Sequence, residues 1–271
     1  MKFAICNEIF QGWSLPDTFA YARKAGYDAV EIAPFTIARS VNDLSPARRI
    51  EIRAMAAAAG VGISAIHWVL VQTEGLHVTS PDPVVRARTA RYFVDLVDFG
   101  ADLGAPAMVV GSPKHRQLLP GVSAAQGWEW AAEVFRPAVT RAAERKLTIC
   151  FEPLAPAETN FINTAEEARR FADLFASPAM SILLDVKAMS AETKPVSQVI
   201  RDSGGRFDYF HANDSNLKGP GFGEVDFHPI AEALREVGYG GTVSVEVFTF
   251  EEGPERIATE SREYLRRVFG Y

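Results

Sequence analysis

Short hydrophobic runs and longer amphipathic stretches alternate along this sequence from one end to the other. The short runs are rich in apolar and β-branched residues, which predicts buried strands. They comprise Lys2–Cys6, Ala29–Ile32, Gly62–Val71, Ala107–Val110 and four later runs that end at Glu152, Asp185, His211 and Glu246. Eight strand signals separated by eight helix signals predict an α/β fold, a single closed (β/α)8 barrel that spans residues 1–271.

The amphipathic stretches carry start and stop signals for helices. Predicted helices run from Ser14 to Gly26, Ser45 to Gly60, Asp82 to about Leu103, Ser123 to Arg145, Thr164 onward, Asp226 onward and Pro254 to Val268. Two of them, at Ser123 and Thr164, open with the Ser/Thr-x-x-Glu/Gln spacing of a capping box. The helix after Asp185 has the weakest signal, and we place it between Ala191 and Ser203.

The last four strands each end on a residue that can bind a metal. These residues are Glu152, Asp185, His211 and Glu246. Their spacing is close to the roughly 30 residues of a strand–helix–strand unit. Because parallel strands of a barrel present their C-terminal ends at one face, we expect the four side chains to meet there. Cys150 and Ser244, two residues earlier, would then face the barrel interior as well.

Three carboxylates in one place would repel each other and raise each other's pKa, and a divalent cation relieves that repulsion. Three carboxylates and one imidazole, without a thiolate, suit Mn, Co or Mg, with Zn or Fe(II) as alternatives. Taken singly, an acidic residue at a strand end also serves to cap the next helix or to pair with a lysine. Four such residues at one level favour the metal site.

An octahedral ion held by four protein ligands keeps two positions open, which suits a chelating polyol or hydroxy-ketone. Such an ion polarises a carbonyl, makes the adjacent C–H acidic and stabilises an enediolate. Glu152 and Glu246 would flank the ion from different sides, so that one removes a proton and the other returns one. Return to the opposite face of the same carbon gives epimerisation, and return to the neighbouring carbon gives aldose–ketose isomerisation.

These residues and their neighbours carry a family resemblance. The motifs are Glu152-Pro-Leu with Glu158-Thr downstream, Asp185, His211-Ala-Asn-Asp, Pro220-Gly-Phe-Gly-Glu-Val-Asp-Phe and Val245-Glu-Val-Phe. Over essentially the whole chain they resemble the sugar isomerase/epimerase family with a xylose-isomerase-like TIM barrel, in particular ketose 3-epimerases of the D-tagatose/D-psicose type. The resemblance implies four metal ligands, Glu152, Asp185, His211 and Glu246. It also implies that Glu152 and Glu246 are the acid/base pair and that Glu158 contacts the substrate.

The chain departs from this family at two positions. The epimerases commonly have Asp-x-x-His after the sixth strand, where this chain has Asp185 and Ala188. They also often have an arginine six residues after the strand-seven histidine, where this chain has Leu217. Both missing groups would contact substrate, so we infer that the metal chemistry survives while the preferred sugar has changed. Lys187 or Lys218 would supply a replacement cation, unless each is only a solvated loop charge.

Other polar candidates come from the first half of the chain. His67, near the end of the third strand, would bind a substrate hydroxyl or serve as a satisfied core group, and Glu31 presents the same alternatives. His115 would reach the barrel mouth from the loop after the fourth strand. Because Lys114 and Arg116 flank it, exposure is the default expectation, with a phosphate contact as the alternative.

Three aromatic residues, Trp13, Trp68 and Phe248, follow or end predicted strands. Each would either form a wall of the pocket or simply pack in the core.

Composition excludes several classes of protein. A net charge of −6 gives no overall attraction to nucleic acid or anionic lipid. The sequence lacks an apolar run of transmembrane length, and the charged N-terminus is unlike a signal peptide, so we expect a cytoplasmic protein without membrane association. Cys6 and Cys150 fall in the first and fifth strands, which predicts buried free thiols. Because barrels of this kind often dimerise or tetramerise, a homodimer or homotetramer is expected.

Three alternatives to a sugar isomerase or epimerase remain open. A lyase or dehydratase would use the same enediolate to expel a β-substituent of a keto-sugar or polyol. A metal-dependent endonuclease for abasic DNA is a related possibility, but it would need many histidines, and this chain has five. A non-catalytic sugar-binding barrel would bind the sugar without exchanging its protons.

Overall fold

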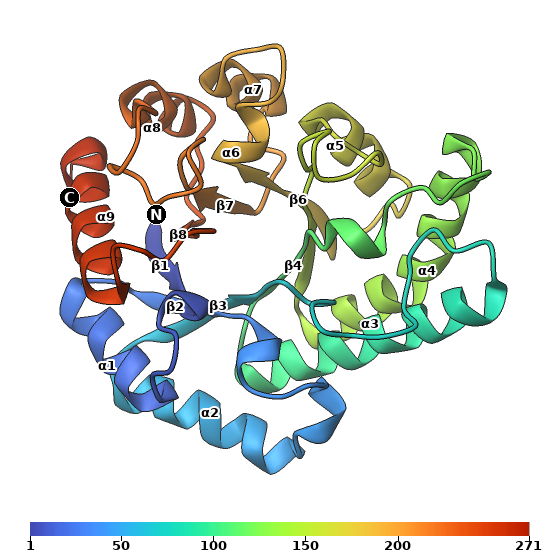
Figure 1. Cartoon of the computed structure of the whole chain (residues 1–271), viewed down its shortest axis with the longest axis horizontal. Helices are drawn as coiled ribbons and strands as arrows, with labels where there is room; N and C mark the ends of the chain where they lie inside the picture. Colours follow the sequence, from blue (N-terminus) through green and yellow to red (C-terminus); the bar gives the residue numbers. More distant parts are fainter. Residues whose placement is uncertain (271) are drawn as a thin grey trace.

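The structure is a computed structural model that describes residues 1–270. Within these residues eight parallel strands pair in sequence order, and β1 pairs with β8 to close the barrel (Figure 1). The strands are β1 (Lys2–Cys6), β2 (Ala29–Ile32), β3 (Gly62–Ile66), β4 (Ala107–Val110), β5 (Thr148–Phe151), β6 (Met180–Asp185), β7 (Tyr209–Ala212) and β8 (Thr242–Val245). The closed eight-stranded TIM barrel predicted from the sequence is confirmed.

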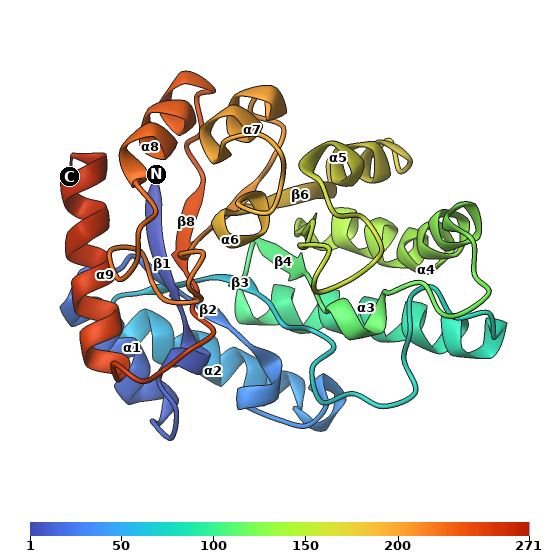
Figure 2. The ribbon, with the colours of Figure 1, turned by 45° about the horizontal axis from the view of Figure 1, so that its top comes forward.

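Helices form an outer layer around the strands (Figures 1 and 2). They are α1 (Leu15–Ala25), α2 (Pro46–Ala58), α3 (Pro83–Leu103), α4 (Ala124–Arg145), α5 (Ala165–Asp173), α6 (Val186–Met189), α7 (Val196–Ser203), α8 (Phe227–Glu236) and α9 (Pro254–Phe269). Ser123 and Thr164 form the predicted capping boxes at the starts of α4 and α5. These two polar caps therefore set where α4 and α5 begin.

Two elements differ from the sequence-based expectation. The third strand ends at Ile66 rather than Val71, because Trp68 adopts a left-handed backbone with φ of 52° and cannot continue the strand. A short additional helix, α6, follows β6 at once, because the Asp185 carboxylate accepts a hydrogen bond from the Ala188 amide at 2.7 Å. Both differences lie at the C-terminal end of the barrel.

Apolar side chains fill the space on both sides of the strands. A large cluster between barrel and helices is rich in phenylalanine. A smaller cluster on the inner face of the strands consists of Ala65, Ala107, Val109, Cys150, Leu183 and Tyr209. Cys150, Leu183 and Tyr209 each stand two positions before a predicted metal ligand, so they pack directly beneath that level.

Both cysteines are buried and free, as predicted. Among residues 1–270 no helix combines the length and the apolar character that crossing a bilayer would require.

Candidate metal centre

The four side chains predicted as metal ligands meet at the C-terminal end of the barrel. Asp185 and His211 are register partners on β6 and β7. Glu152 and Glu246 directly follow β5 and β8. One potential ligand atom from each residue lies within 4.8 Å of the other three, and all four residues are buried. The strand ends thus place three carboxylates and one imidazole around a common point.

The orientation of His211 fits a metal ligand. Its Nε2 lies 3.1 and 3.2 Å from the two carboxylate oxygens of Glu31. Its Nδ1 faces Glu246 at 3.1 Å, Glu152 at 3.8 Å and Asp185 at 3.9 Å. Within residues 1–270 this buried Nδ1 has no hydrogen-bond partner. A ring that donates from Nε2 to Glu31 keeps a lone pair on Nδ1, which is the geometry of a histidine that binds an ion.

The electrostatics of the cluster also fit a cation. Burial, together with the charges of Glu152 and Glu246, raises the pKa of Asp185 to about 7. Burial likewise raises the pKa of Glu152. The pKa of Glu246 is held well below its ordinary value although burial opposes this, because the imidazoles of His211 and His67 lie beside it. A divalent ion would offset the repulsion that raises the pKa of Asp185 and Glu152.

His67, predicted as a substrate contact, lies in a second polar layer beside the cluster. Its Nε2 is 3.0 Å from Glu8, and its Nδ1 is 3.5 Å from Glu246. Glu8 was missed in the sequence analysis because it lies in a short 3-10 turn after β1. Its position two residues after Cys6 was the available signal, since it continues the inward-facing alternation of β1.

A cavity of about 410 Å³ opens over the cluster, and its lining includes Glu152, His211 and Glu246. His67, His115, Glu158 and Lys187, the predicted substrate contacts, all line it. The Lys187 ammonium lies 2.8 Å from Glu158 and 3.9 Å from the ring centre of Phe248. The cavity therefore combines three histidines, an ion pair and an aromatic wall.

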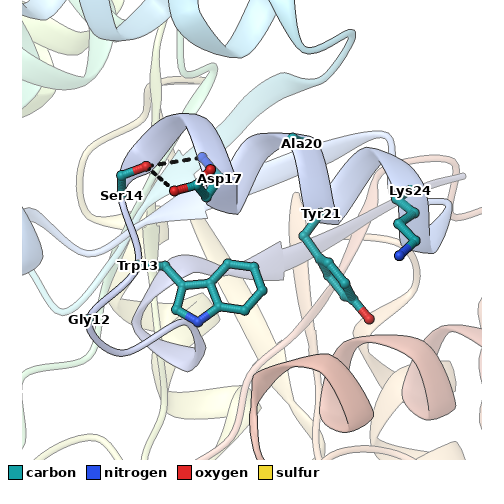
Figure 3. Close-up of a pocket in the computed structure, with 7 residues that line it drawn as sticks. All are labelled: Gly12, Trp13, Ser14, Asp17, Ala20, Tyr21 and Lys24. Atoms are coloured by element: carbon teal, nitrogen blue, oxygen red, sulfur yellow. Dashed lines mark hydrogen bonds between the residues drawn. The ribbon is translucent and has the colours of Figure 1, made fainter.

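The remaining residues considered from the sequence lie partly at the cavity and partly away from it. Lys218 pairs with Glu252 outside the cavity lining. Trp68 and Phe248 form part of the cavity wall, whereas Trp13 lines a separate hollow with Tyr21 at α1 (Figure 3).

The loop after β4 differs from the expectation that its charges would leave His115 exposed. His115 is half-buried and lines the cavity, and the neighbouring Arg116 is only 1% exposed. Its guanidinium donates to the carbonyl oxygen of Glu152 at 2.6 Å and stacks 4.6 Å from the ring centre of Phe151. These partners lie far away in the sequence, so neighbouring charges gave no sign of them. Arg116 fixes the backbone that carries Glu152.

Comparisons with known proteins agree with this architecture. The sequence profile of the family described as Xylose isomerase-like TIM barrel matches residues 19–268. A D-psicose 3-epimerase of Ruminiclostridium cellulolyticum is 26% identical over 231 residues, which cover 83% of this chain and 75% of the relative. A 3-dehydro-D-guloside 4-epimerase of Escherichia coli is 22% identical over 272 residues, covering 98% and 99% of the two chains.

Solved structures show the same fold. The crystal structure of D-psicose 3-epimerase with D-tagatose, from Clostridium cellulolyticum H10, matches with a TM-score of 0.85 at 22% identity. The match covers 99% of this chain and 98% of the other. Since the family profile spans nearly the whole sequence, the chain belongs to the xylose isomerase-like TIM barrel family.

Proposed function

We propose that this protein is a divalent-metal-dependent sugar isomerase or epimerase that acts on a ketose or keto-sugar, with Glu152 and Glu246 as its acid/base pair. The observation that supports this most is the unpartnered Nδ1 of His211, which faces three buried carboxylates beneath an open cavity. The relatives named above are sugar epimerases, which supports the same class of reaction.

The ion would be held by Glu152, Asp185, His211 and Glu246. This oxygen-rich donor set suits Mn²⁺, Co²⁺ or Mg²⁺, with Zn²⁺ or Fe²⁺ as alternatives. When bound, the ion supplies Lewis acidity, which polarises a substrate carbonyl and stabilises the negative charge that develops on it. Glu31 would keep the His211 ring in the orientation and tautomer that this requires.

Glu152 and Glu246 would carry out the proton transfer. They follow β5 and β8, so they approach the cavity from different sides. One glutamate would take the proton next to the carbonyl, and the other would return one on the opposite face. Removal and return on opposite faces of one carbon invert its configuration, and the roles exchange in the reverse direction.

Substrate orientation would come from the polar groups above the cluster. The Glu158–Lys187 pair offers an acceptor and a donor to substrate hydroxyls, and His67 and His115 add further partners. The walls formed by Trp68 and Phe248 would limit the access of water.

A lyase remains the second candidate. The positions where related epimerases carry a histidine and an arginine are Ala188 and Leu217, and neither side chain lines the cavity. Lys187 does line it, and its ammonium could protonate a departing β-substituent after the same proton abstraction. Such a reaction forms an enone that absorbs in the ultraviolet, whereas an epimer does not.

Neutralising either glutamate is expected to abolish most turnover. Glu152→Gln and Glu246→Gln should each lower kcat about 10²- to 10⁴-fold on a keto-sugar that the wild type converts, because each loses the group that moves a proton. The assay measures epimer formation, deuterium uptake from D₂O and ultraviolet absorbance. Glu251→Gln, on an exposed loop residue, is the matched control. Full turnover in both variants would contradict the assignment.

Metal binding is expected to stabilise the fold. After treatment with a chelator, saturating Mn²⁺ should raise Tm by about 5 °C, because the ion binds only the folded cluster. His211→Ala should lose this response, and His228→Ala, at an exposed histidine on α8, should keep it. A wild-type Tm that is unchanged by Mn²⁺, Co²⁺ and Mg²⁺ alike would exclude the metal site.

The carboxylate of Glu152 depends on empty space at Gly111. A Cβ at position 111 would lie 2.3 Å from Glu152 Oε2, so Gly111→Ala must displace that oxygen. We expect Mn²⁺ affinity, measured by calorimetry, to fall about 10- to 100-fold. Gly62→Ala is the control, because its added Cβ would meet only ordinary contacts, the nearest at 3.8 Å. Equal affinity in both variants would show that Glu152 tolerates the displacement.

Lys187 is expected to act on substrate binding. Lys187→Ala should raise KM about tenfold, because a hydrogen bond from a charged donor to the substrate is lost. Lys218→Ala, which removes a lysine outside the cavity lining, should leave KM unchanged. Steady-state kinetics of both variants on the same sugar measure this difference in KM. An unchanged KM in Lys187→Ala would show that Lys187 does not contact the substrate.

A further inference from the structure

Trp68 leaves β3 in a conformation that bulky residues rarely adopt. Its φ of 52° lies in the left-handed region. The turn is held by a hydrogen bond from the Val71 amide to the Trp68 carbonyl at 3.1 Å. The Leu70 amide donates to Ser112 Oγ at 3.3 Å, and Ser112 is itself left-handed with φ of 46°. Two neighbouring loops thus fix each other in strained backbone geometry.

The strain has a direct geometric result. In a regular strand His67 and Trp68 would point to opposite faces, one into the barrel and one toward the helices. Here both side chains line the cavity. The left-handed turn interrupts the alternation and brings two consecutive side chains to the same side. Strain of this kind is concentrated at sites where it serves function.

The indole is fixed against the acid/base candidate Glu246. Its Nε1 donates to Glu246 Oε1 at 2.8 Å. The ring packs near two phenylalanines, with its centroid 6.2 Å from that of Phe35 and 6.1 Å from that of Phe248. The donor is therefore held by aromatic packing as well as by its backbone.

The two oxygens of Glu246 have different surroundings. Oε1 lies 2.8 Å from Trp68 Nε1 and 3.5 Å from His67 Nδ1. Oε2 lies 3.1 Å from the unpartnered His211 Nδ1 and 3.4 Å from Asn213 Nδ2. One oxygen thus faces the β3 loop, and the other faces the cluster of metal-ligand candidates.

We propose that Trp68 is a positioning residue for Glu246. Its indole N–H holds Oε1 at the β3 loop, so that Oε2 is the oxygen offered to the ion and the carboxylate keeps one orientation above it. This inference rests on the proposed function, because it assumes that Glu246 transfers a proton in that reaction. It also explains why a strained turn follows β3, where an unstrained strand would direct the indole away from the cavity.

The kinetic test is Trp68→Phe, which keeps a smaller aromatic ring on the wall and removes the N–H donor. We expect kcat to fall about 10- to 100-fold while KM stays within about threefold, because the lost hydrogen bond acts on Glu246 and not on the substrate. Trp13→Phe is the matched control, since Trp13 lines the separate hollow at α1 (Figure 3). A kcat in Trp68→Phe equal to that of the control would overturn the proposal.

A measurement independent of turnover uses ¹⁵N-labelled tryptophan. The chain has four tryptophans, and the indole resonance that is absent from Trp68→Phe identifies Trp68. In the wild type this N–H should exchange slowly with solvent. Glu246→Ala should shift the resonance and speed its exchange at least tenfold, and Glu251→Ala should not. An indole resonance that is identical in wild type and Glu246→Ala would overturn the hydrogen bond itself.

A failure of the proposed function and a failure of the inference about Trp68 give different results. If the wild type converts no keto-sugar, the proposed function fails, while the indole resonance still reports whether Trp68 holds Glu246. Mn²⁺ titration of the wild type and Trp68→Phe adds a second readout, with affinity expected to fall about tenfold in the variant. Equal Mn²⁺ affinity would count against a role for Trp68 in orienting Oε2.

Discussion

Three carboxylates buried beside one imidazole are the constraint around which the rest of this barrel is arranged. Like charges in a low-dielectric interior repel strongly, and an unpaired buried carboxylate is costly. Glu152, Asp185 and Glu246 are surrounded by cationic groups and hydrogen-bond donors rather than by apolar side chains alone, which offsets this cost. His211 lies among them, and although burial raises the pKa of Glu152 and Asp185, Lys187 lies close enough to offset part of that rise. A divalent ion would complete the same compensation.

A polar network beside the apolar residues beneath the cluster keeps His211 in place. Glu31, which accepts from His211, also accepts from the Tyr209 hydroxyl at 3.1 Å, and the oxygen of that hydroxyl can in turn accept from the Ser64 hydroxyl, which lies 2.7 Å away. These side chains come from β2, β3 and β7, so the network spans the barrel interior. Each hydrogen bond fixes the next group, and together they determine which nitrogen of His211 faces the carboxylates.

Sequence patterns predicted the parts of the site that depend on periodicity. The strand ends carrying Glu152, Asp185, His211 and Glu246 could be located because closed parallel barrels repeat one geometry eight times. The fold followed from the same repetition. Other parts depend on loop conformations that no period describes. The inward turn of Trp68 follows from a left-handed backbone, which a sequence rarely signals for tryptophan.

Arg116 and Glu8 illustrate two further limits of prediction from the sequence. Arg116 stands in a run of basic residues, which is typical of a solvated loop, yet its partners are backbone carbonyls that only the tertiary fold brings near. Glu8 lies beyond the end of β1, where the pattern of alternating residues no longer identifies a strand. Pattern analysis thus finds the residues that a regular element directs, and the residues that loops direct become visible only in three dimensions.

The short helix α6 after β6 connects the candidate metal ligand Asp185 to Lys187 in the cavity lining. Asp185 uses Oδ1 to cap α6 at the Ala188 amide, and its Oδ2 faces His211 Nδ1 in the cluster. One side chain therefore fixes both the metal-ligand candidate and the start of the helix that follows. Successive helical residues point about 100° apart, so only some positions of α6 meet the cavity. Here Lys187 meets it and Ala188 is buried against the fold, which places a cation beside Glu158 while leaving the strand ends as they are.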